Sequence, residues 1–448
     1  MPVITLKQAA AWCGGTVEKQ YETVEFLGAN NDTRILLPGQ LFIVLKGARD
    51  GHDFIPAAFE KGAAAVLCSR KVGDYPAIYV EDPRIALGQI AAQALKNLGC
   101  KTVGVTGSVG KSTTKEMIAK VLESTYRVSK TPANHNNDIG MPMAILAMPE
   151  TTQVAVLEMG MNHFREIAYL SQIGRPDVAV IINIGTMHIE FLGSREGICQ
   201  AKLEILEGMD ENGKLLVNGG DDMLKVLPIT PVQQVIPFGL GANCQVRAEN
   251  VRQEEEMLCF RACTPAGEFP VEMQLEGEHF VSDAMAAVAV GLELGVDLEN
   301  IRLSLNDFRN MAGRQEIFAH AGMTIIRDCY NAGPESMAAS LAVLGAKNGR
   351  KIAVLGDMLE LGDCAPEEHK KVGEIAAKNA DIILAYGPNG CHVVSGAANK
   401  DARCFDTREE MALALKKEAR EGDVILFKGS RGMRLELVLD QFLDEKRD

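Results

Sequence analysis

With 448 residues, 47% of them hydrophobic, the chain is too long for one hydrophobic core, and we predict about three domains. Its formal net charge of −14 argues against a nucleic-acid partner, and no apolar run is long enough to insert into a membrane. The 11 cysteines are scattered and the N-terminus lacks a secretion signal, so we expect reduced thiols in a cytoplasmic protein.

Residues 1–82 are predicted to form a small α/β domain. A helix is expected over residues 4–12 and a strand over residues 41–45, and residues 47–68 read as a loop, a helix and a strand. Between them lies the sequence Asp32, Thr33, Arg34. Taken alone, this sequence is compatible with a surface ion pair that contributes little to stability.

Residues 83–312 are predicted to form a central domain around a phosphate-binding loop. A short apolar strand over residues 102–106 leads into a glycine-containing turn and then a helix with a core face. Free backbone N–H groups, the positive end of the helix dipole and a lysine together suit a nucleotide phosphate. The residues of this loop are Gly107, Ser108, Val109, Gly110, Lys111, Ser112 and Thr113.

The spacing of these glycines misses the general Walker pattern, because Val105 stands where the first glycine is expected. The alternative is an ordinary glycine turn with a solvated Lys111. The order of strand, two glycines, Gly-Lys-Ser-Thr and amphipathic helix favours an ATP phosphate site. The hydroxyl of Ser112 then suits a Mg²⁺ ion that accompanies the nucleotide.

The rest of the central domain is predicted to be a mostly parallel sheet with helices on both faces. Further buried strands are expected over residues 154–157, 178–184 and 215–217. Residues 244–276 resemble antiparallel strands added to the edge, and residues 280–294 an alanine-rich helix.

Residues 313–448 are predicted to form a third domain of alternating strands and helices. Strands are expected over residues 323–326, 351–355, 381–385 and 423–427. A doubly wound, Rossmann-like sheet is the natural arrangement for this alternation.

Chemically suited side chains follow several of these strands, where parallel sheets bind ligands. Glu158 and His188 suit a hard divalent cation, held directly or through water, although either alone is more often a loop residue. Lys202 lies in a helical segment, where a lysine is ordinarily solvated.

The third domain offers a second group of such side chains. Arg314 lies in the expected interdomain hinge, Asp328 suits ribose hydroxyls, and Tyr330 suits stacking on a base. Lys428 and Arg431 are strand-end cations, which we expect to face the crevice and an anionic substrate.

In combination, these motifs resemble the Mur ligase family over essentially the whole chain. The resemblance rests on DTR with PGQLFIVLKGARDGHDF, TGSVGKST, NHNNDIGMP, EMGMNH, INIGTMHIEFLGS, AKLEI, GRQE, DCYNAGPES, VLGDMLELG and FKGSRG. GDMLELG and the YNA-type segment favour the members that join D-alanyl-D-alanine to UDP-N-acetylmuramoyl-tripeptide. The resemblance implies an ATP-dependent peptide ligase of peptidoglycan precursor synthesis, which works through an acyl phosphate. Separately, we expect a monomer.

The resemblance also implies roles for individual residues. UDP would be bound by Asp32, Thr33 and Arg34, and the rest of the substrate by Asn134, Asn136, Asn137, Asn331, Lys428 and Arg431. Mg²⁺ would be held by Ser112, Glu158, His188 and Lys202, the last as a carbamate. ATP would meet Arg314, Asp328, Tyr330 and Asp283, and the catalytic set would be Lys111, Glu158, His188, Lys202 and Arg314.

Three residues depart from the family pattern: Asp283 and Gly333 stand where asparagine is usual, and Phe164 where glycine is common. Asp283 has two interpretations. Its carboxylate is either a weakened adenine contact, because it offers acceptors only, or a cap of the alanine-rich helix.

Two other functions are compatible with the motifs. One is a related ligase with a different acceptor, such as a folylpolyglutamate-synthase-like enzyme, against which the DTR-bearing first domain argues. The other is a non-catalytic nucleotide-binding paralogue, against which the retained Lys111, Glu158, His188 and Lys202 argue.

Overall fold

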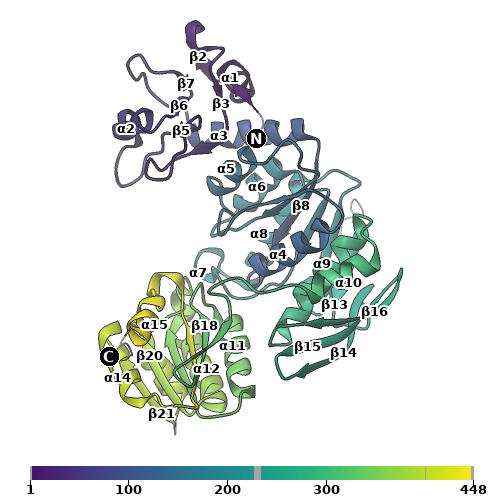
Figure 1. Cartoon of the computed structure of the whole chain (residues 1–448), viewed down its shortest axis with the longest axis vertical. Coiled ribbons are helices and arrows are strands. Elements are labelled where there is room, and N and C mark those ends of the chain that lie inside the picture. The colour runs from purple at the N-terminus through teal and green to yellow at the C-terminus, as the bar shows by residue number, and fades with distance from the viewer. Residues whose placement is uncertain (1–2, 227–233, 399, 445–448) are drawn as a thin grey trace.

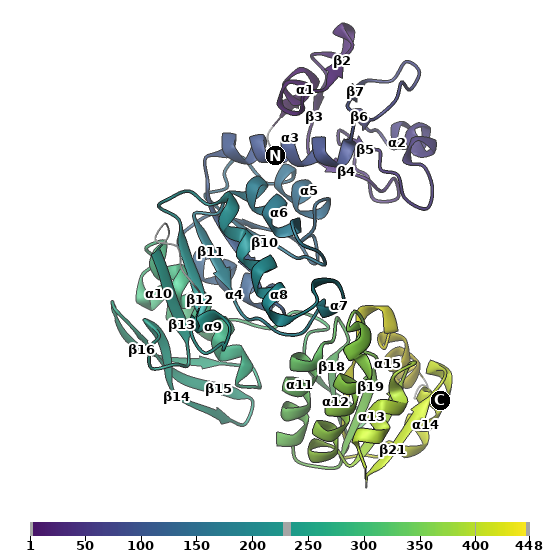
Figure 2. The same ribbon diagram turned by 180° about the vertical axis from the view of Figure 1, so that it is seen from behind.

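The computed structural model describes residues 3–226, 234–398 and 400–444. Three α/β units follow one another from the N-terminus to the C-terminus, with the central unit between the other two (Figures 1 and 2). This arrangement confirms the predicted three-domain α/β fold. None of the helices in the described ranges is both long and apolar enough to cross a membrane.

The first unit contains a five-stranded sheet of order β2-β7-β6-β5-β4. These strands are β2 (Thr16–Val17), β4 (Ala29–Asn30), β5 (Leu41–Ile43), β6 (Ala65–Cys68) and β7 (Ala77–Tyr79), with helix α2 (Ile55–Glu60) before β6. The predicted first helix, α1 (Leu6–Cys13), begins later than expected. Ile4 and Thr5 pair instead as β1 with β3 (Glu25–Phe26), and the Thr5 hydroxyl caps α1 by accepting from the Gln8 N–H.

The central unit is built on a nine-stranded sheet of order β16-β15-β14-β13-β12-β11-β8-β10-β9. The parallel strands are β8 (Lys101–Thr106), β9 (Val128–Lys130), β10 (Val154–Glu158), β11 (Val178–Ile181), β12 (Lys214–Asn218) and β13 (Gln234–Gly239), of which β13 was not predicted. As expected, an antiparallel extension lies at one edge: β14 (Val246–Glu254), β15 (Met257–Thr264) and β16 (Gly267–Met273).

Helices cover both faces of this sheet, as predicted. One face packs on α4 (Lys111–Glu123), α9 (His279–Glu293) and α10 (Leu298–Asn306). The other packs on α3 (Pro83–Leu98), α5 (Gly140–Leu146), α6 (Glu166–Gly174) and α8 (Arg195–Leu203). The apolar cluster of this second face continues into the first unit through residues such as Leu6 and Ile78.

The third unit is a doubly wound sheet of order β17-β18-β22-β19-β20-β21. Its predicted parallel strands are β18 (Met323–Asp328), β19 (Lys351–Gly356), β20 (Ile382–Tyr386) and β22 (Val424–Lys428). The edge strands β17 (Glu316–His320) and β21 (Asp401–Phe405) were not predicted. Helices α11 (Pro334–Ala346), α12 (Ala365–Asn379) and α13 (Gly390–Gly396) cover one face, and α14 (Arg408–Glu418) and α15 (Glu436–Leu443) the other.

Candidate functional site

The candidate site begins where three neighbouring parallel strands of the central sheet end. In register, Glu158 at the end of β10 pairs with Val105 of β8, and Ile181 at the end of β11 pairs with Thr106. The carboxyl ends of β10, β8 and β11 therefore lie side by side. The segments that follow these strands carry the phosphate loop, Glu158 and the chain leading to His188.

The phosphate loop has the predicted geometry. Gly110 has a φ of +84°, and a Cβ there would lie 2.8 Å from Asp283 Oδ1, so glycine is required. Within the described part of the chain, no acceptor is bonded to the backbone N–H groups of residues 110–113. Lys111 Nζ folds back onto the loop and donates to Gly107 O at 2.7 Å and to Ser108 O at 3.2 Å. This loop offers an anion several unused donors at a helix start.

Asn183, which was not predicted from the sequence, holds the first half of this loop. Its Oδ1 accepts from the N–H groups of Ser108 at 3.0 Å and Val109 at 2.9 Å, and its Nδ2 donates to Val109 O at 3.0 Å. The N–H groups of Ser108 and Val109 are thus already satisfied. The N–H groups of residues 110–113 are the donors of this loop that remain for an anion, within the described part of the chain. The signal was an asparagine closely following an apolar strand.

Glu158 is buried, with 2% of its surface exposed. Asn136 Nδ2 donates to its Oε1 at 2.9 Å, whereas its Oε2 has no hydrogen-bond partner and lies 3.6 Å from Lys115 Nζ. Lys115, a second residue that the sequence analysis missed, is fully buried and also donates to Thr131 O at 2.7 Å. One carboxylate oxygen of Glu158 is therefore available to another ligand.

His188 meets the third unit. Its Nδ1 lies 2.5 Å from Oε2 of Glu360, a residue of the GDMLELG motif that the sequence analysis did not single out. Both residues have left-handed backbones, with φ of +66° for His188 and +64° for Glu360. Burial lowers the pKa of His188, although Glu360 opposes this shift. Conversely, contact with the His188 imidazole lowers the pKa of Glu360.

Lys202 is buried in α8, with 2% of its surface exposed, so the solvated alternative is wrong. No hydrogen bond or ion pair among the described residues involves its ammonium group. Burial, together with the positive charge of Lys111, lowers the pKa of Lys202 well below its usual value. The fraction of neutral amine is correspondingly increased.

Arg314 reaches from the start of the third unit to the phosphate loop. Its Nη2 donates to Ser112 Oγ at 2.8 Å, and its Cζ lies 4.0 Å from the centre of the Tyr330 ring. Tyr330 therefore stacks on this guanidinium in the structure. The contact brings two of the predicted site residues of the third unit to Ser112.

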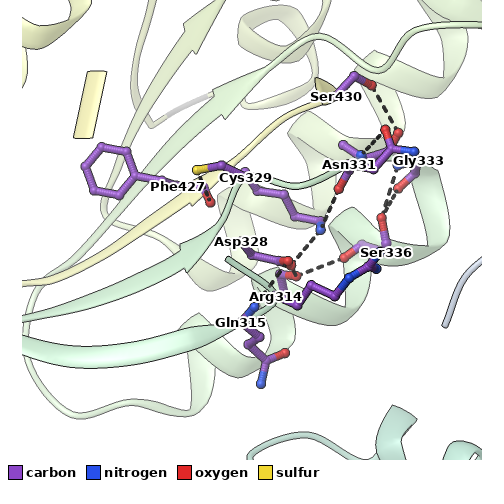
Figure 3. A network of polar contacts seen from close by, with 12 residues as sticks. Arg314, Gln315, Asp328, Cys329, Asn331, Gly333, Ser336, Phe427 and Ser430 are labelled. Atoms are coloured by element: carbon purple, nitrogen blue, oxygen red, sulfur yellow. Dashed lines mark hydrogen bonds and ion pairs between the residues drawn. The ribbon is translucent and has the colours of Figure 1, made fainter. Parts of the chain in front are cut away.

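Asp328 lies at the centre of a polar network at the end of β18 (Figure 3). Its Oδ2 accepts from Lys428 Nζ and Ser340 Oγ, each at 2.6 Å, and its Oδ1 from the N–H of Gln315 at 3.3 Å. Burial opposes ionisation, but the charge and hydrogen bond of Lys428 outweigh it and lower the pKa of Asp328.

This network corrects the expected position of Lys428. The lysine does not face an open crevice: its side chain is 2% exposed and pairs with Asp328, which lies opposite it in the β18–β22 register. Lys428 also donates to the backbone oxygen of Asn331 at 3.3 Å. By contrast, the side chain of Arg431 is 67% exposed and pairs only loosely with Glu436, at 3.3 Å.

The remaining expected substrate contacts lie on the surface. Asp32 and Arg34 flank Thr33 in a turn and bind each other, with Arg34 Nη2 2.6 Å from Asp32 Oδ2. The hydrogen bonds from Arg34 lower the pKa of Asp32 to about 2. Asn134 is exposed in the loop after β9, and Asn137 Oδ1 accepts from the N–H of Gly140 at 2.7 Å, at the start of α5.

Asp283 does not cap its helix. Helix α9 begins at His279, and Asp283 lies in its buried interior, so the capping interpretation is wrong. Its Oδ1 accepts from Thr114 Oγ1 at 2.7 Å, beside the phosphate loop. Burial raises the pKa of Asp283 to about 7, although the Thr114 hydrogen bond opposes the shift.

The other two departures have simple surroundings. A Cβ at Gly333 would lie 2.6 Å from Met187 Cγ, so glycine permits the close approach of the third unit to the segment before His188. Phe164 is exposed, with 41% of its surface accessible.

The site suits a magnesium–nucleotide complex better than a metal held by protein alone. Across the described ranges, no three His, Cys, Asp or Glu side chains gather as a metal site. The partnerless Oε2 of Glu158 and the hydroxyl of Ser112 are oxygen ligands of the kind that Mg²⁺ prefers. Mg²⁺ typically combines one or two such ligands with substrate phosphates and water.

Comparison with known proteins agrees with this geometry. Residues 105–291 match the Mur ligase middle domain, and residues 313–431 the glutamate ligase domain of Mur ligases. The UDP-N-acetylmuramoyl-tripeptide–D-alanyl-D-alanine ligase of Bacillus subtilis is 41% identical, with 98% of each chain covered. The chain belongs to the Mur ligase family.

Solved structures of MurF ligases have the same fold over nearly the whole chain. A crystal structure of MurF from Acinetobacter baumannii superposes with a TM-score of 0.93 and 33% identity, covering 99% of this chain and 100% of that one. The MurF ligase of Thermotoga maritima in complex with ADP has a TM-score of 0.84 and 32% identity, covering 94% and 97%.

Replacing Lys111 by alanine should abolish turnover with ATP while leaving the fold intact. Its ammonium group bonds only to its own loop, and loss of a donor to developing charge typically costs ~100-fold or more in rate. Steady-state kinetics and a thermal melt test this expectation. Lys120→Ala, on the same helix and paired with exposed Asp307, is the matched control. Wild-type turnover in the Lys111 variant would contradict the assignment of the loop.

The Asp283→Asn variant should be more stable than the wild type at pH 8. Because the folded-state pKa of Asp283 is raised to about 7, its contribution to stability falls as pH rises through 7. Asparagine keeps an acceptor for Thr114 without this cost. Thermal melts at pH 5 and pH 8 should show the gap between variant and wild type widening with pH. Exposed Asp74→Asn is the control, and an equal gap at both pH values would contradict a protonated Asp283.

Proposed function

We propose that the chain joins D-alanyl-D-alanine to UDP-N-acetylmuramoyl-tripeptide and converts ATP to ADP and phosphate. The observation that carries this proposal is the gathering of Lys111, Glu158, His188 and buried Lys202 at one edge of the central sheet, faced by Arg314. The ligases named for this reaction match nearly the whole chain, which includes the first unit. The product would enter peptidoglycan precursor synthesis in the cytoplasm.

The residues suit activation of a carboxylate by phosphoryl transfer. A free carboxylate is a poor acyl donor, so the γ-phosphoryl group of ATP is first transferred to the carboxylate of the tripeptide. The amine of the dipeptide then attacks the acyl phosphate and releases phosphate. Lys111 and Arg314 would neutralise charge on the transferred group, and the N–H groups of residues 110–113 would orient it.

Magnesium and a modified lysine complete the proposal. Glu158, Ser112 and His188 would hold Mg²⁺, which supplies charge neutralisation at the phosphates when bound. Lys202 would react as its neutral amine with CO₂ to give a carbamate and a proton. The buried lysine, whose pKa is well below its usual value, supports this assignment.

The outer units would bring the two substrates together. The first unit, residues 1–82, would hold the UDP end through Asp32, Thr33 and Arg34, with Asn134, Asn136 and Asn137 nearer the reacting end. The third unit, residues 313–448, would bring the dipeptide with Asn331 and Arg431, while buried Lys428 would hold Asp328 in place. Asp328, Tyr330 and Asp283 would contribute to the nucleotide site. We propose that the chain acts as a monomer.

Phosphate release should require ATP, UDP-N-acetylmuramoyl-tripeptide and D-alanyl-D-alanine together. Omission of either the tripeptide substrate or the dipeptide should leave only background release of phosphate. The acyl phosphate forms on the tripeptide, and the amine of the dipeptide consumes it. Coupled phosphate detection and mass spectrometry of the product measure this. Release with glutamate in place of the dipeptide would instead support the alternative acceptor, and no release under any condition would support a non-catalytic paralogue.

Lys202→Ala should lose most of its activity and regain part of it with added acetate, which replaces the carboxylate end of the carbamate. Lys202→Arg keeps a cation but cannot be carbamylated, so it should be inactive with or without acetate. Carbon NMR of wild-type protein incubated with ¹³C-bicarbonate should show a carbamate signal that both variants lack. Full activity of Lys202→Ala without acetate would exclude this role.

A further inference from the structure

Residues 183–188, here called the bridge segment, touch both the phosphate loop and the third unit. The segment follows β11 and precedes helix α7 (Ile189–Leu192). Figures 1 and 2 show α7 at the junction of the central and third units. Only His188 of this segment was expected to act in the reaction, so the other contacts are unexplained by the proposed function.

One end of the bridge segment holds the phosphate loop. In addition to the three side-chain hydrogen bonds of Asn183, its backbone oxygen accepts from the N–H of Ser108 at 3.1 Å. The N–H of Gly185 donates to Ser108 Oγ at 2.8 Å, and Ser108 is 1% exposed. The shape of residues 107–109 is therefore set by this segment as much as by the loop itself.

The other end of the bridge segment is held by the third unit. Glu335, in the first turn of α11, accepts from both the N–H and the hydroxyl of Thr186, at 2.8 and 3.0 Å. The carboxylate also packs on Gly185, where a Cβ would lie 2.8 Å from its carbon. Its second oxygen, Oε2, is buried without a hydrogen-bond partner, so within the described residues the side-chain hydrogen bonds of Glu335 all come from Thr186.

We propose that the bridge segment transmits the docking of the third unit to the phosphate loop, with Glu335 and Asn183 as positioning residues. The inference rests on the nucleotide site of the proposed function, and adds how that site is kept ready. Gly185 bonds to Ser108 and packs on Glu335, and Thr186 is the next residue, so neither contact can shift without the other. Loss of the Glu335 contact makes the bridge segment less ordered. Part of the free energy of nucleotide binding must then be used to order the segment and the phosphate loop, so affinity falls.

A double-mutant cycle between Asn183 and Glu335 tests this coupling. Affinity of the intact chain for ADP with Mg²⁺, measured by calorimetry without the other substrates, should fall about 5-fold or more in Asn183→Ala and in Glu335→Ala. The double variant should bind no more weakly than the weaker single variant, because both substitutions release the same segment. Additive losses, or unchanged affinity in Glu335→Ala, would overturn the proposal.

Three further variants sharpen the result. Glu335→Gln keeps an acceptor for Thr186 and should bind like the wild type; a loss as large as that of Glu335→Ala would overturn the role of this hydrogen bond. Exposed Glu374→Ala, in the same unit, is the control and should bind normally. Thermal melts identify any unfolded variant. If Asn183→Ala unfolds, Ser108→Ala takes its place in the cycle, because the Ser108 hydroxyl accepts from the Gly185 N–H. ADP binding needs no ligation, so failure here is distinct from failure of the ligase assay.

Discussion

Positive charge concentrated at the carboxyl edge of the central sheet is the constraint on which the rest of the site depends. Lys111 is half-buried and Lys115 is buried there, and Arg314 joins them from the third unit. Buried cations are costly unless anions accompany them. Lys115 Nζ lies 3.3 Å from Glu116 Oε1 and 3.6 Å from Glu158 Oε2, whereas the ammonium group of Lys111 bonds to backbone oxygens of its own loop. A polyanionic nucleotide is the ligand that best offsets such a charge.

Much of the site could be predicted, because its chemistry is tied to strand ends that local patterns reveal. The phosphate loop, Glu158 and His188 follow apolar strands, and their convergence required only a parallel sheet. The missed strands were less distinctive: β17 and β21 are edge strands whose residues are mostly half-buried, so their alternation is weak. Strand β13 directly follows the undescribed residues 227–233, and it contains Pro237, a residue that argues against a strand when only the sequence is read.

The errors concern side-chain partners, which single-sequence patterns do not encode. Lys428 was expected to face a ligand, but strand order places it directly opposite Asp328 on the neighbouring strand, 100 residues earlier in the chain. Asp283 was weighed as a cap because it lies near a predicted helix start, but the helix begins four residues before it. Likewise, nothing near Glu335 in sequence indicates that it binds Thr186, 149 residues away. Each partner became visible only with the topology.

The two junctions of the central unit differ in kind, and the difference bears on motion. The first unit shares an apolar cluster with the central one, which includes Leu6 and Leu87. Within the described residues, the apolar clusters of the third unit are its own apart from half-buried Ile189. Its contacts with the central unit are largely polar, as in Arg314 with Ser112 and Glu335 with Thr186. Polar interfaces of this kind permit domain motion more readily than shared apolar cores.

The polar contacts at this second junction also involve groups that a nucleotide would need. Ser112 is bonded to Arg314, and His188 contacts Glu360, although both Ser112 and His188 are expected magnesium ligands. Left-handed backbones at His188 and Glu360 carry a conformational cost of order 1–3 kcal/mol each. The contacts between the docked units must offset this cost. Binding of a magnesium–nucleotide complex would therefore exchange these contacts for ligand contacts rather than add to them. Such an exchange of polar contacts would let the third unit change its position when the proposed substrates and nucleotide are bound and released.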